Sequence, residues 1–185
     1  VSDAGIPGIC DPGEDIASRV KSEGLDMICV PGACAAITAL VSSGLPSSSF
    51  VFEGFLPRKQ SDREIILLEI SKNKKTTIIY ESPKRLKRLL KELFDFCGGN
   101  REIMVARELT KKFEEHIGNN INEVSELFKD KEVIGEITIV LKGKAKDKKI
   151  PFNESDLKKD LKELVEAGLS LSAASKYLAK KNGIK

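Results

Sequence analysis

Four short peptides in the middle of the chain carry glutamate, three of them together with arginine or lysine. They are Glu53–Lys59, Tyr80–Arg85, Arg107–Lys112 and Ile134–Glu136, and each is expected where a strand of an α/β sheet ends. Ligands of open α/β sheets bind at the carboxyl ends of strands, so the peptides predict one cleft that is lined by both acidic and basic side chains. Such a cleft suits a ligand that carries both a positive and a negative charge, or a polyanion whose phosphates bind the basic side chains. For any one peptide, an ordinary surface ion pair is the alternative.

Glycine, proline and aspartate are concentrated in residues 1–13, and a helical pattern follows directly. Asp11 is suited to cap this helix, with Pro12 as its first residue and Gly24 as its stop. Three residues are expected to form the buried stripe of the helix, namely Ile16, Ala17 and Val20. The pattern predicts a binding loop held on a rigid helix.

A second loop follows, with a strand expected at Leu25–Val30 and a helix at Ala33–Val41 that ends at Gly44. The small residues at the start of this helix leave backbone N–H groups uncovered, so a ligand can approach the main chain there. Close packing of the helix on a sheet is the alternative explanation of the small residues.

Composition and charge favour a globular protein with a basic tail. The chain has 185 residues and a net charge of +3, of which residues 143–185 carry +5 and the preceding residues −2. No stretch has the length or composition of a membrane span or a signal peptide, which predicts a cytoplasmic protein without a membrane partner. The four cysteines show no C-x-x-C pairing, and His116 is the only histidine. We therefore expect no metal site, reduced and mostly buried thiols, and an exposed or hydrogen-bonded His116.

Three parts are expected along the chain. Residues 1–46 resemble the second half of a parallel α/β unit, residues 47–142 form a second α/β domain, and residues 143–185 form a basic linker with a partial helix-turn-helix-like tail. A lysine-rich tail with no partner is the alternative for the last part. Both ends of the sequence look cut, so we expect an internal fragment of a longer reading frame. The second domain is expected to have strands at 50–52, 76–80, 103–107, 113–117 and 136–141, and helices at 62–70, 83–96 and 122–128.

Common phosphate-binding and hydrolase motifs are missing. The sequence contains no G-x-x-x-x-G-K-[ST] loop, no G-x-G-x-x-G after a strand and no G-x-S-x-G. Nucleotide hydrolysis, dinucleotide redox chemistry and esterase chemistry therefore lack their signatures.

Several peptides resemble one enzyme family in order along the chain. They are Val-Ser-Asp-Ala-Gly-x-Pro from Val1, Asp-Pro-Gly from Asp11, Pro-Gly-x-Cys-Ala-Ala-Ile-Thr-Ala-Leu from Pro31, Glu-Gly-Phe-Leu-Pro from Glu53, Tyr-Glu-Ser-Pro-x-Arg-Leu from Tyr80 and Ala-Arg-Glu-Leu-Thr-Lys from Ala106. The chain thereby resembles the small-subunit ribosomal RNA methyltransferase I family, a branch of the tetrapyrrole methylase superfamily. The resemblance implies an α/β fold of two domains with a cofactor cleft between them, plus a small helical tail. No counterpart is found for the superfamily's opening strand, its Pro-x-Gly-Asn type loop or the third tail helix.

The same resemblance implies a function and a cofactor. The expected reaction is transfer of a methyl group from S-adenosylmethionine to a cytidine 2′-hydroxyl in small-subunit (16S) ribosomal RNA, by a homodimer acting on the RNA or on the small ribosomal subunit. The residues that the resemblance places at the cofactor are Asp3, Ala4, Gly5, Ile6, Ile9, Cys34, Ala35, Tyr80, Glu81, Gly135 and Glu136.

The chemistry of this reaction selects candidate catalytic residues. Methyl transfer from a sulfonium is an in-line displacement, which depends on alignment of donor and acceptor. A ribose hydroxyl also needs a base, for which Glu81, Glu108 and Lys111 are candidates, with Arg107 to orient a phosphate or carboxylate. Glu108 and Arg107 rank first because Lys111 follows them. Side chains expected to bind the RNA backbone are Arg58, Lys59, Arg85, Lys111 and those of the lysine-rich tail.

Two other functions remain open from the sequence. A tetrapyrrole methylase or diphthine synthase would share the cofactor loops but have an apolar or protein-binding acceptor cleft, against which the basic residues argue. A non-catalytic RNA-binding module would bind no cofactor.

Overall fold

The computed structural model describes residues 5–11, 13–145 and 154–182. Two compact units are present, Val1–Ala145 and Lys146–Lys185, and each is described separately. The boundary between them falls within the predicted basic linker, whereas a division at residue 46 stays a prediction.

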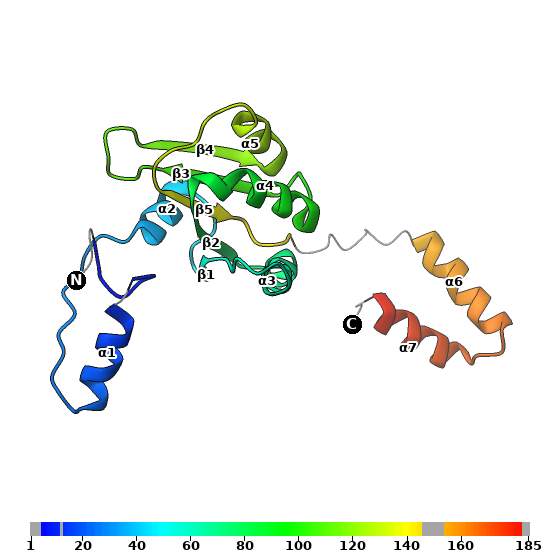
Figure 1. The fold of residues 1–185 in the computed structure, drawn as a ribbon. Helices are drawn as coiled ribbons and strands as arrows, with labels where there is room; N and C mark the ends of the chain where they lie inside the picture. The colour runs from blue at the N-terminus through cyan, green and yellow to red at the C-terminus, as the bar shows by residue number, and fades with distance from the viewer. Residues whose placement is uncertain (1–4, 12, 146–153, 183–185) are drawn as a thin grey trace. The chain divides into compact units, whose positions relative to one another are not determined.

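A five-stranded sheet in the order β1-β2-β5-β3-β4 forms the centre of the first unit (Figure 1). The strands are β1 (Phe50–Phe55), β2 (Thr76–Glu81), β3 (Glu102–Arg107), β4 (Glu115–Asn120) and β5 (Ile137–Leu141). β1 and β2 pair in parallel, whereas β5 pairs antiparallel with both β2 and β3, and β4 pairs antiparallel with β3. β1, β2 and β3 therefore end at one edge of the sheet, and β4 and β5 begin there.

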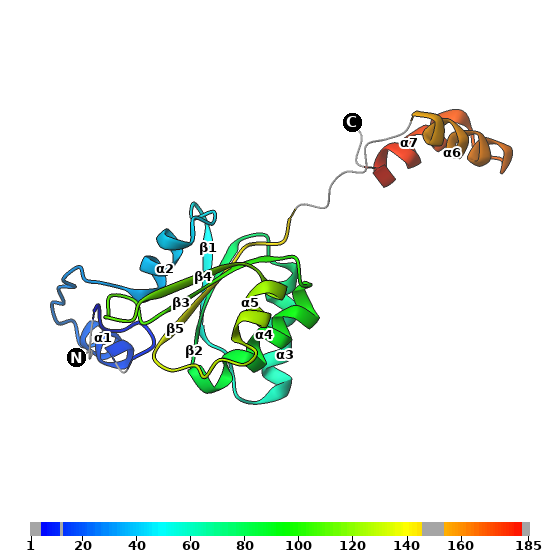
Figure 2. The same ribbon diagram turned by 90° about the horizontal axis from the view of Figure 1, so that it is seen from above.

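Helices cover both faces of this sheet (Figure 2). Side chains alternate along each strand, so apolar side chains lie on both faces and are buried by the helices. On β2, Ile79 belongs to the core beneath α3 (Gln60–Lys72), α4 (Pro83–Cys97) and α5 (Ile121–Phe128). Ile78 belongs to a second core beneath α2 (Ala35–Ser43) on the other face. The leucines of α4 at i, i+3, i+4 and i+7 are buried as predicted, but Phe94, expected in the same stripe, is 44% exposed.

The first helix and the segment after it differ from the prediction. α1 (Gly13–Ser22) is capped by Asp11, whose Oδ1 accepts the Gly13 N–H at 2.8 Å, and the chain leaves it at Gly24 with φ +71°. None of its described side chains is buried, and Ile16 is 62% exposed, so the predicted buried stripe is wrong. The expected strand at Leu25–Val30 is irregular, because no strand in the described part of the chain offers it backbone partners.

Two helices make up the described part of the second unit. α6 (Glu154–Glu166) ends at Gly168 with φ +96°, and α7 (Leu171–Asn182) follows, with the Ser170 hydroxyl accepting the Ala173 N–H at 3.3 Å. Ala174 and Leu178 are buried. Two helices separated by a short turn agree with the helix-turn-helix-like tail predicted for residues 143–185. None of the helices in the described ranges has the length and apolar character needed to cross a membrane.

The thiols and the single histidine have the following environments. Cys10 and Cys29 are exposed and Cys34 and Cys97 are partly buried, so the expectation of mostly buried thiols is wrong. His116 contacts the Glu114 carboxylate at 2.6 Å, which confirms the hydrogen-bonded histidine.

Candidate functional site

The predicted charged peptides gather at one edge of the sheet. Three of them include the last residues of β1, β2 and β3 and continue into the loops that follow. The fourth, Ile134–Glu136, precedes β5 rather than following a strand, which corrects the prediction. It still lies at this edge, because antiparallel β5 pairs Ile137 with both Glu81 and Arg107. The strand reversal therefore brings all four peptides together.

Tyr80 connects β2 to the start of α2. Its ring lies against Phe52 and Phe55, with ring centroids 4.9 and 5.6 Å away, and its hydroxyl oxygen accepts the Ala36 N–H at 3.0 Å. Burial raises the pKa of Tyr80 to about 12, so the hydroxyl stays neutral. Cys34 is the N-cap residue of α2, but its side chain makes no hydrogen bond to the N–H groups of the helix. The Ala36 N–H, predicted to be uncovered, is therefore occupied by Tyr80, and the prediction of uncovered N–H groups at the start of α2 applies only to its neighbours.

The N-terminal loop lies at the same end of the sheet. The Ile6 N–H donates to the Ala33 carbonyl at 2.8 Å. Gly5 has φ +78°, and any Cβ there would collide with Ala33, so only glycine allows this approach. A side chain at Gly54 would meet the Cys10 sulfur at 2.8 Å, and partial removal of that sulfur from water raises the pKa of the largely exposed Cys10 thiol. The loop, the start of α2 and the end of β1 therefore form one cluster.

Other predicted cofactor residues have different positions. Ile9 is 43% exposed beside this cluster. Gly135 and Glu136 lie with Glu108 instead. Asp3 and Ala4 lie outside the described residues.

Glu108 is held in a strained backbone conformation by a compact network. It has φ +54°, and Thr110 in the same turn has φ +65°, a region costly for residues other than glycine. The Glu108 N–H donates to the Glu136 carbonyl at 2.9 Å, and Glu108 Oε1 accepts the Glu136 N–H, also at 2.9 Å. Gly135 lacks a side chain where any Cβ would overlap the Glu108 carboxylate. Such strain, when the surrounding contacts fix it, is characteristic of functional sites.

Hydrogen bonds within this network, assisted by the Lys111 charge, lower the pKa of Glu108 and favour its ionised form. The Glu136 N–H, then the Lys111 ammonium 3.0 Å away, lower the pKa of Glu108. The same Glu108 hydrogen bond, followed by that of Glu136 at 3.1 Å, raises the pKa of Lys111. Arg107 is paired with Glu115 at 3.0 Å and donates to the Ile134 carbonyl at 3.3 Å. The structure thus brings Arg107, Glu108 and Lys111 together around the peptide before β5.

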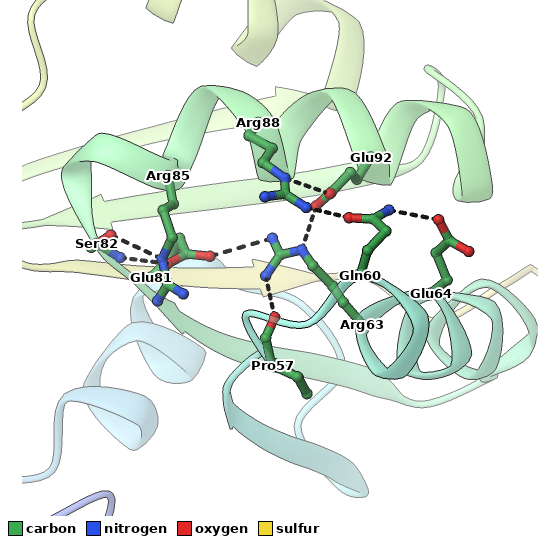
Figure 3. A network of polar contacts seen from close by, with 9 residues as sticks. All are labelled: Pro57, Gln60, Arg63, Glu64, Glu81, Ser82, Arg85, Arg88 and Glu92. Atoms are coloured by element: carbon green, nitrogen blue, oxygen red, sulfur yellow. Dashed lines mark hydrogen bonds and ion pairs between the residues drawn. The ribbon is translucent and has the colours of Figure 1, made fainter.

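Glu81 points to the opposite face of the sheet from Tyr80. Its carboxylate is fully buried and contacts Arg85 at 2.7 Å and Arg63 at 3.4 Å (Figure 3). Arg63, itself 1% exposed, also contacts Glu92 at 2.7 Å. A carboxylate paired with two guanidiniums is poorly placed to accept a substrate proton, so this geometry favours a structural role for Glu81.

The predicted RNA-binding residues are dispersed. Arg58 and Lys59 are exposed after β1, and Lys59 pairs with Asp62 at 3.4 Å. Arg85 is mostly committed to Glu81. Lysines missed by the sequence reasoning lie nearby: Lys84, Lys87 and Lys131 line a groove beside the edge. The i, i+3 spacing of Lys84 and Lys87 on one helix was the available signal, which the leucine pattern of the same helix obscured.

Fold, edge site and sequence together define the class of protein. The chain belongs to the tetrapyrrole (corrin/porphyrin) methylases, whose family profile matches residues 1–125. It is 39% identical over 179 residues to ribosomal RNA small subunit methyltransferase I of Synechocystis sp., a match covering 97% of this chain and 64% of that protein. With the Vibrio cholerae protein of the same name it shares 53% identity over 114 residues, covering 62% of this chain and 40% of that protein. The chain thus spans 40% to 64% of the length of these relatives.

Solved structures confirm the expected α/β, tetrapyrrole methylase-like fold class. Cobalt precorrin-4 methyltransferase aligns with a TM-score of 0.56 at 16% identity, covering 75% of this chain and 61% of that one. Uroporphyrin-III C-methyltransferase from Thermus thermophilus, solved in complex with S-adenyl homocysteine, aligns with a TM-score of 0.51 at 17% identity, covering 74% and 62%. At these identities the likeness concerns the fold alone.

Proposed function

We propose that the protein transfers a methyl group from S-adenosylmethionine to the 2′-hydroxyl of a cytidine in small-subunit ribosomal RNA. The observation that carries the proposal is the edge of the sheet, where a helix start without a side-chain cap and a glycine loop accompany an ionised glutamate, an arginine and a lysine. The ribosomal RNA methyltransferase relatives support the substrate, and the neighbour solved with S-adenyl homocysteine supports the cofactor. The predicted homodimer and cytoplasmic location stay predictions.

The residues at this edge fit the chemistry of the cofactor. Uncovered N–H groups at the start of α2 suit polar atoms of a nucleoside, and exposed Ile9 and Phe55 offer apolar surface to a base. The exposed carboxylate of Glu136 suits a positively charged group. We assign cofactor binding to Gly5, Ile6, Ile9, Cys34, Ala35, Tyr80, Gly135 and Glu136, with Asp3 and Ala4 as further candidates from the sequence. S-adenosylmethionine supplies the electrophilic methyl group.

Among the candidate bases, we select Glu108. It is ionised at neutral pH and can accept a proton, whereas the raised pKa of Lys111 keeps that side chain a cation. Lys111 and Arg107 then serve to orient Glu108 and the phosphates beside the reacting ribose. Glu81 supports the site from behind the sheet through Arg85 and Arg63.

Cofactor binding by the full-length protein tests the first half of the proposal. Gly5→Ala is expected to weaken S-adenosylmethionine binding about tenfold or more, because alanine at positive φ costs about 1–2 kcal/mol and its Cβ would push the loop away from Ala33. Titration calorimetry measures the dissociation constant.

Gly24→Ala is the matched control for this substitution. Gly24 has φ +71°, so alanine brings similar strain, but no atom lies within 4 Å of a Cβ there. Its cofactor affinity should equal that of the unsubstituted protein. Equal affinities for both variants would remove the loop from the cofactor site, and no binding by the unsubstituted protein would reject the methyltransferase proposal.

A further inference from the structure

A groove lies between the start of α4 and the segment before β5. Its volume is about 590 Å³. Ser82, the N-cap of α4, and Pro83, Lys84 and Lys87 of the helix line it from one side, and residues 131–135 line it from the other. The Lys87 ammonium donates to the Lys129 carbonyl at 2.8 Å, which connects the two sides at one point.

The lining is basic with an apolar component. Lys84, Lys87 and Lys131 are exposed, and none of them forms an ion pair with a residue in the described ranges, while Glu132 is the one acidic residue of the lining. Pro83, Val133 and Ile134 supply apolar surface, and Ile134 is 64% exposed. Lysines along an apolar groove suit a phosphate backbone with its riboses, since each ammonium can contact a phosphate as a point charge.

The groove is continuous with the candidate active site. Ile134 lines the groove, and its carbonyl accepts a hydrogen bond from Arg107 at 3.3 Å. Gly135 also lines it and packs directly against the Glu108 carboxylate. A nucleic-acid strand lying in the groove would therefore reach Glu108 where the groove ends.

We propose that this groove binds the phosphate backbone of the RNA strand beside the nucleotide that is methylated, through Lys84, Lys87 and Lys131. The inference rests on the proposed function and names the surface that holds its substrate. It differs in part from the surface predicted from the sequence. Arg58 and Lys59 follow β1, whereas the groove lies beside α4, which also carries the predicted Arg85, and the segment before β5.

The test replaces all three groove lysines with alanine in the full-length protein. A single-stranded contact contributes about 0.7 to the slope of log affinity against log salt, so the triple variant should lose about 2 from this slope. At 0.1 M salt the same relation gives binding of small-subunit RNA about 100-fold weaker. The dissociation constant for S-adenosylmethionine should not change.

Lys74, Lys75 and Lys91 provide a control with the same loss of charge. These lysines are exposed and lie outside the groove, Lys91 on α4 itself. Replacing the three with alanine should leave the salt slope and affinity near those of the unsubstituted protein, and thermal unfolding checks that both triple variants fold.

The outcomes separate this inference from the proposed function. If the groove and control variants bind RNA equally while the unsubstituted protein methylates RNA, the groove assignment is wrong and the function stands. If the unsubstituted protein neither binds nor methylates RNA, both fail. Selective loss of RNA affinity and salt slope in the groove variant supports the assignment.

Discussion

Replacing Arg63 with methionine is expected to lower the free energy of unfolding by about 3–5 kcal/mol. Arg63 is 1% exposed and contacts Glu81 at 3.4 Å and Glu92 at 2.7 Å, and its guanidinium also donates to the Pro57 carbonyl at 3.4 Å (Figure 3). Removal of the Arg63 guanidinium leaves the carboxylates of Glu81 and Glu92 with fewer positive partners on this face of the sheet. A buried charge without its partner is costly. Urea denaturation followed by circular dichroism measures the change.

Arg88→Met is the matched control for Arg63→Met. Arg88 also contacts Glu92, at 2.9 Å, but its side chain is 51% exposed, so we expect a change of about 0–1 kcal/mol. The double variant Arg63→Met with Glu81→Leu should recover part of the loss, because the charge left behind is removed as well. A loss below about 1 kcal/mol for Arg63→Met would show that the network contributes little to stability.

Glu108→Gln is expected to lower the methyl-transfer kcat by about 10²–10⁴-fold, the usual contribution of a general base. Glutamine can still accept the Glu136 N–H but cannot take a proton, so the dissociation constant for S-adenosylmethionine should stay within a few-fold. The pKa of Glu108 is lowered, so the base stays ionised as pH falls toward its ordinary titration range. Protonation of Glu108 should therefore not lower the methyl-transfer rate above about pH 5. Single-turnover kinetics with small-subunit RNA measure the rate.

Glu126→Gln provides the control for this substitution. Glu126 is an exposed glutamate of α5 that, like Glu108, pairs with a lysine three residues away, at 3.4 Å. Its replacement should leave kcat unchanged. An unchanged kcat in Glu108→Gln would contradict the assignment of Glu108 as the base. If Glu108→Gln weakened S-adenosylmethionine binding by the same factor by which it lowered kcat, Glu108 would be a positioning residue instead.

Local signals in the sequence predicted most elements of the first unit. Proline after Ser82 and the leucine series predicted α4 at 83–96, one residue short of its observed end at Cys97. The small-residue helix start and Gly44 likewise predicted α2, which begins at Ala35 and ends at Ser43 with Gly44 at φ +65°. These signals succeed because caps and hydrophobic periodicity depend on nearby residues.

Features that depend on distant partners could not be predicted in the same way. Leu25–Val30 has the composition of a strand, but a strand forms only where a neighbour supplies hydrogen-bond partners. The reversed direction of β5 is set by pairing with β2 and β3, so Ile134–Glu136 precedes a strand rather than following one. Because β5 runs antiparallel to β2 and β3, the Ile134–Glu136 peptide nevertheless lies at the predicted edge.

The roles of adjacent site residues also depend on the fold. Tyr80 and Glu81 are neighbours in one motif, yet alternation along β2 places Tyr80 against α2 and Glu81 against Arg63 behind the sheet. The positive φ of Glu108 requires Gly135 and the backbone of Glu136, which are distant in sequence. The sequence thus indicated which residues gather, and the structure shows which functional groups they can offer.

The most direct test of the proposed function is transfer of labelled methyl from S-adenosylmethionine by the full-length protein. Naked small-subunit RNA, assembled small ribosomal subunits and a tetrapyrrole are offered in parallel, and labelled RNA is digested to nucleosides. We predict label on the ribose of a cytidine from small-subunit RNA. Label on the tetrapyrrole, on a base, or on none of the three acceptors would contradict the account.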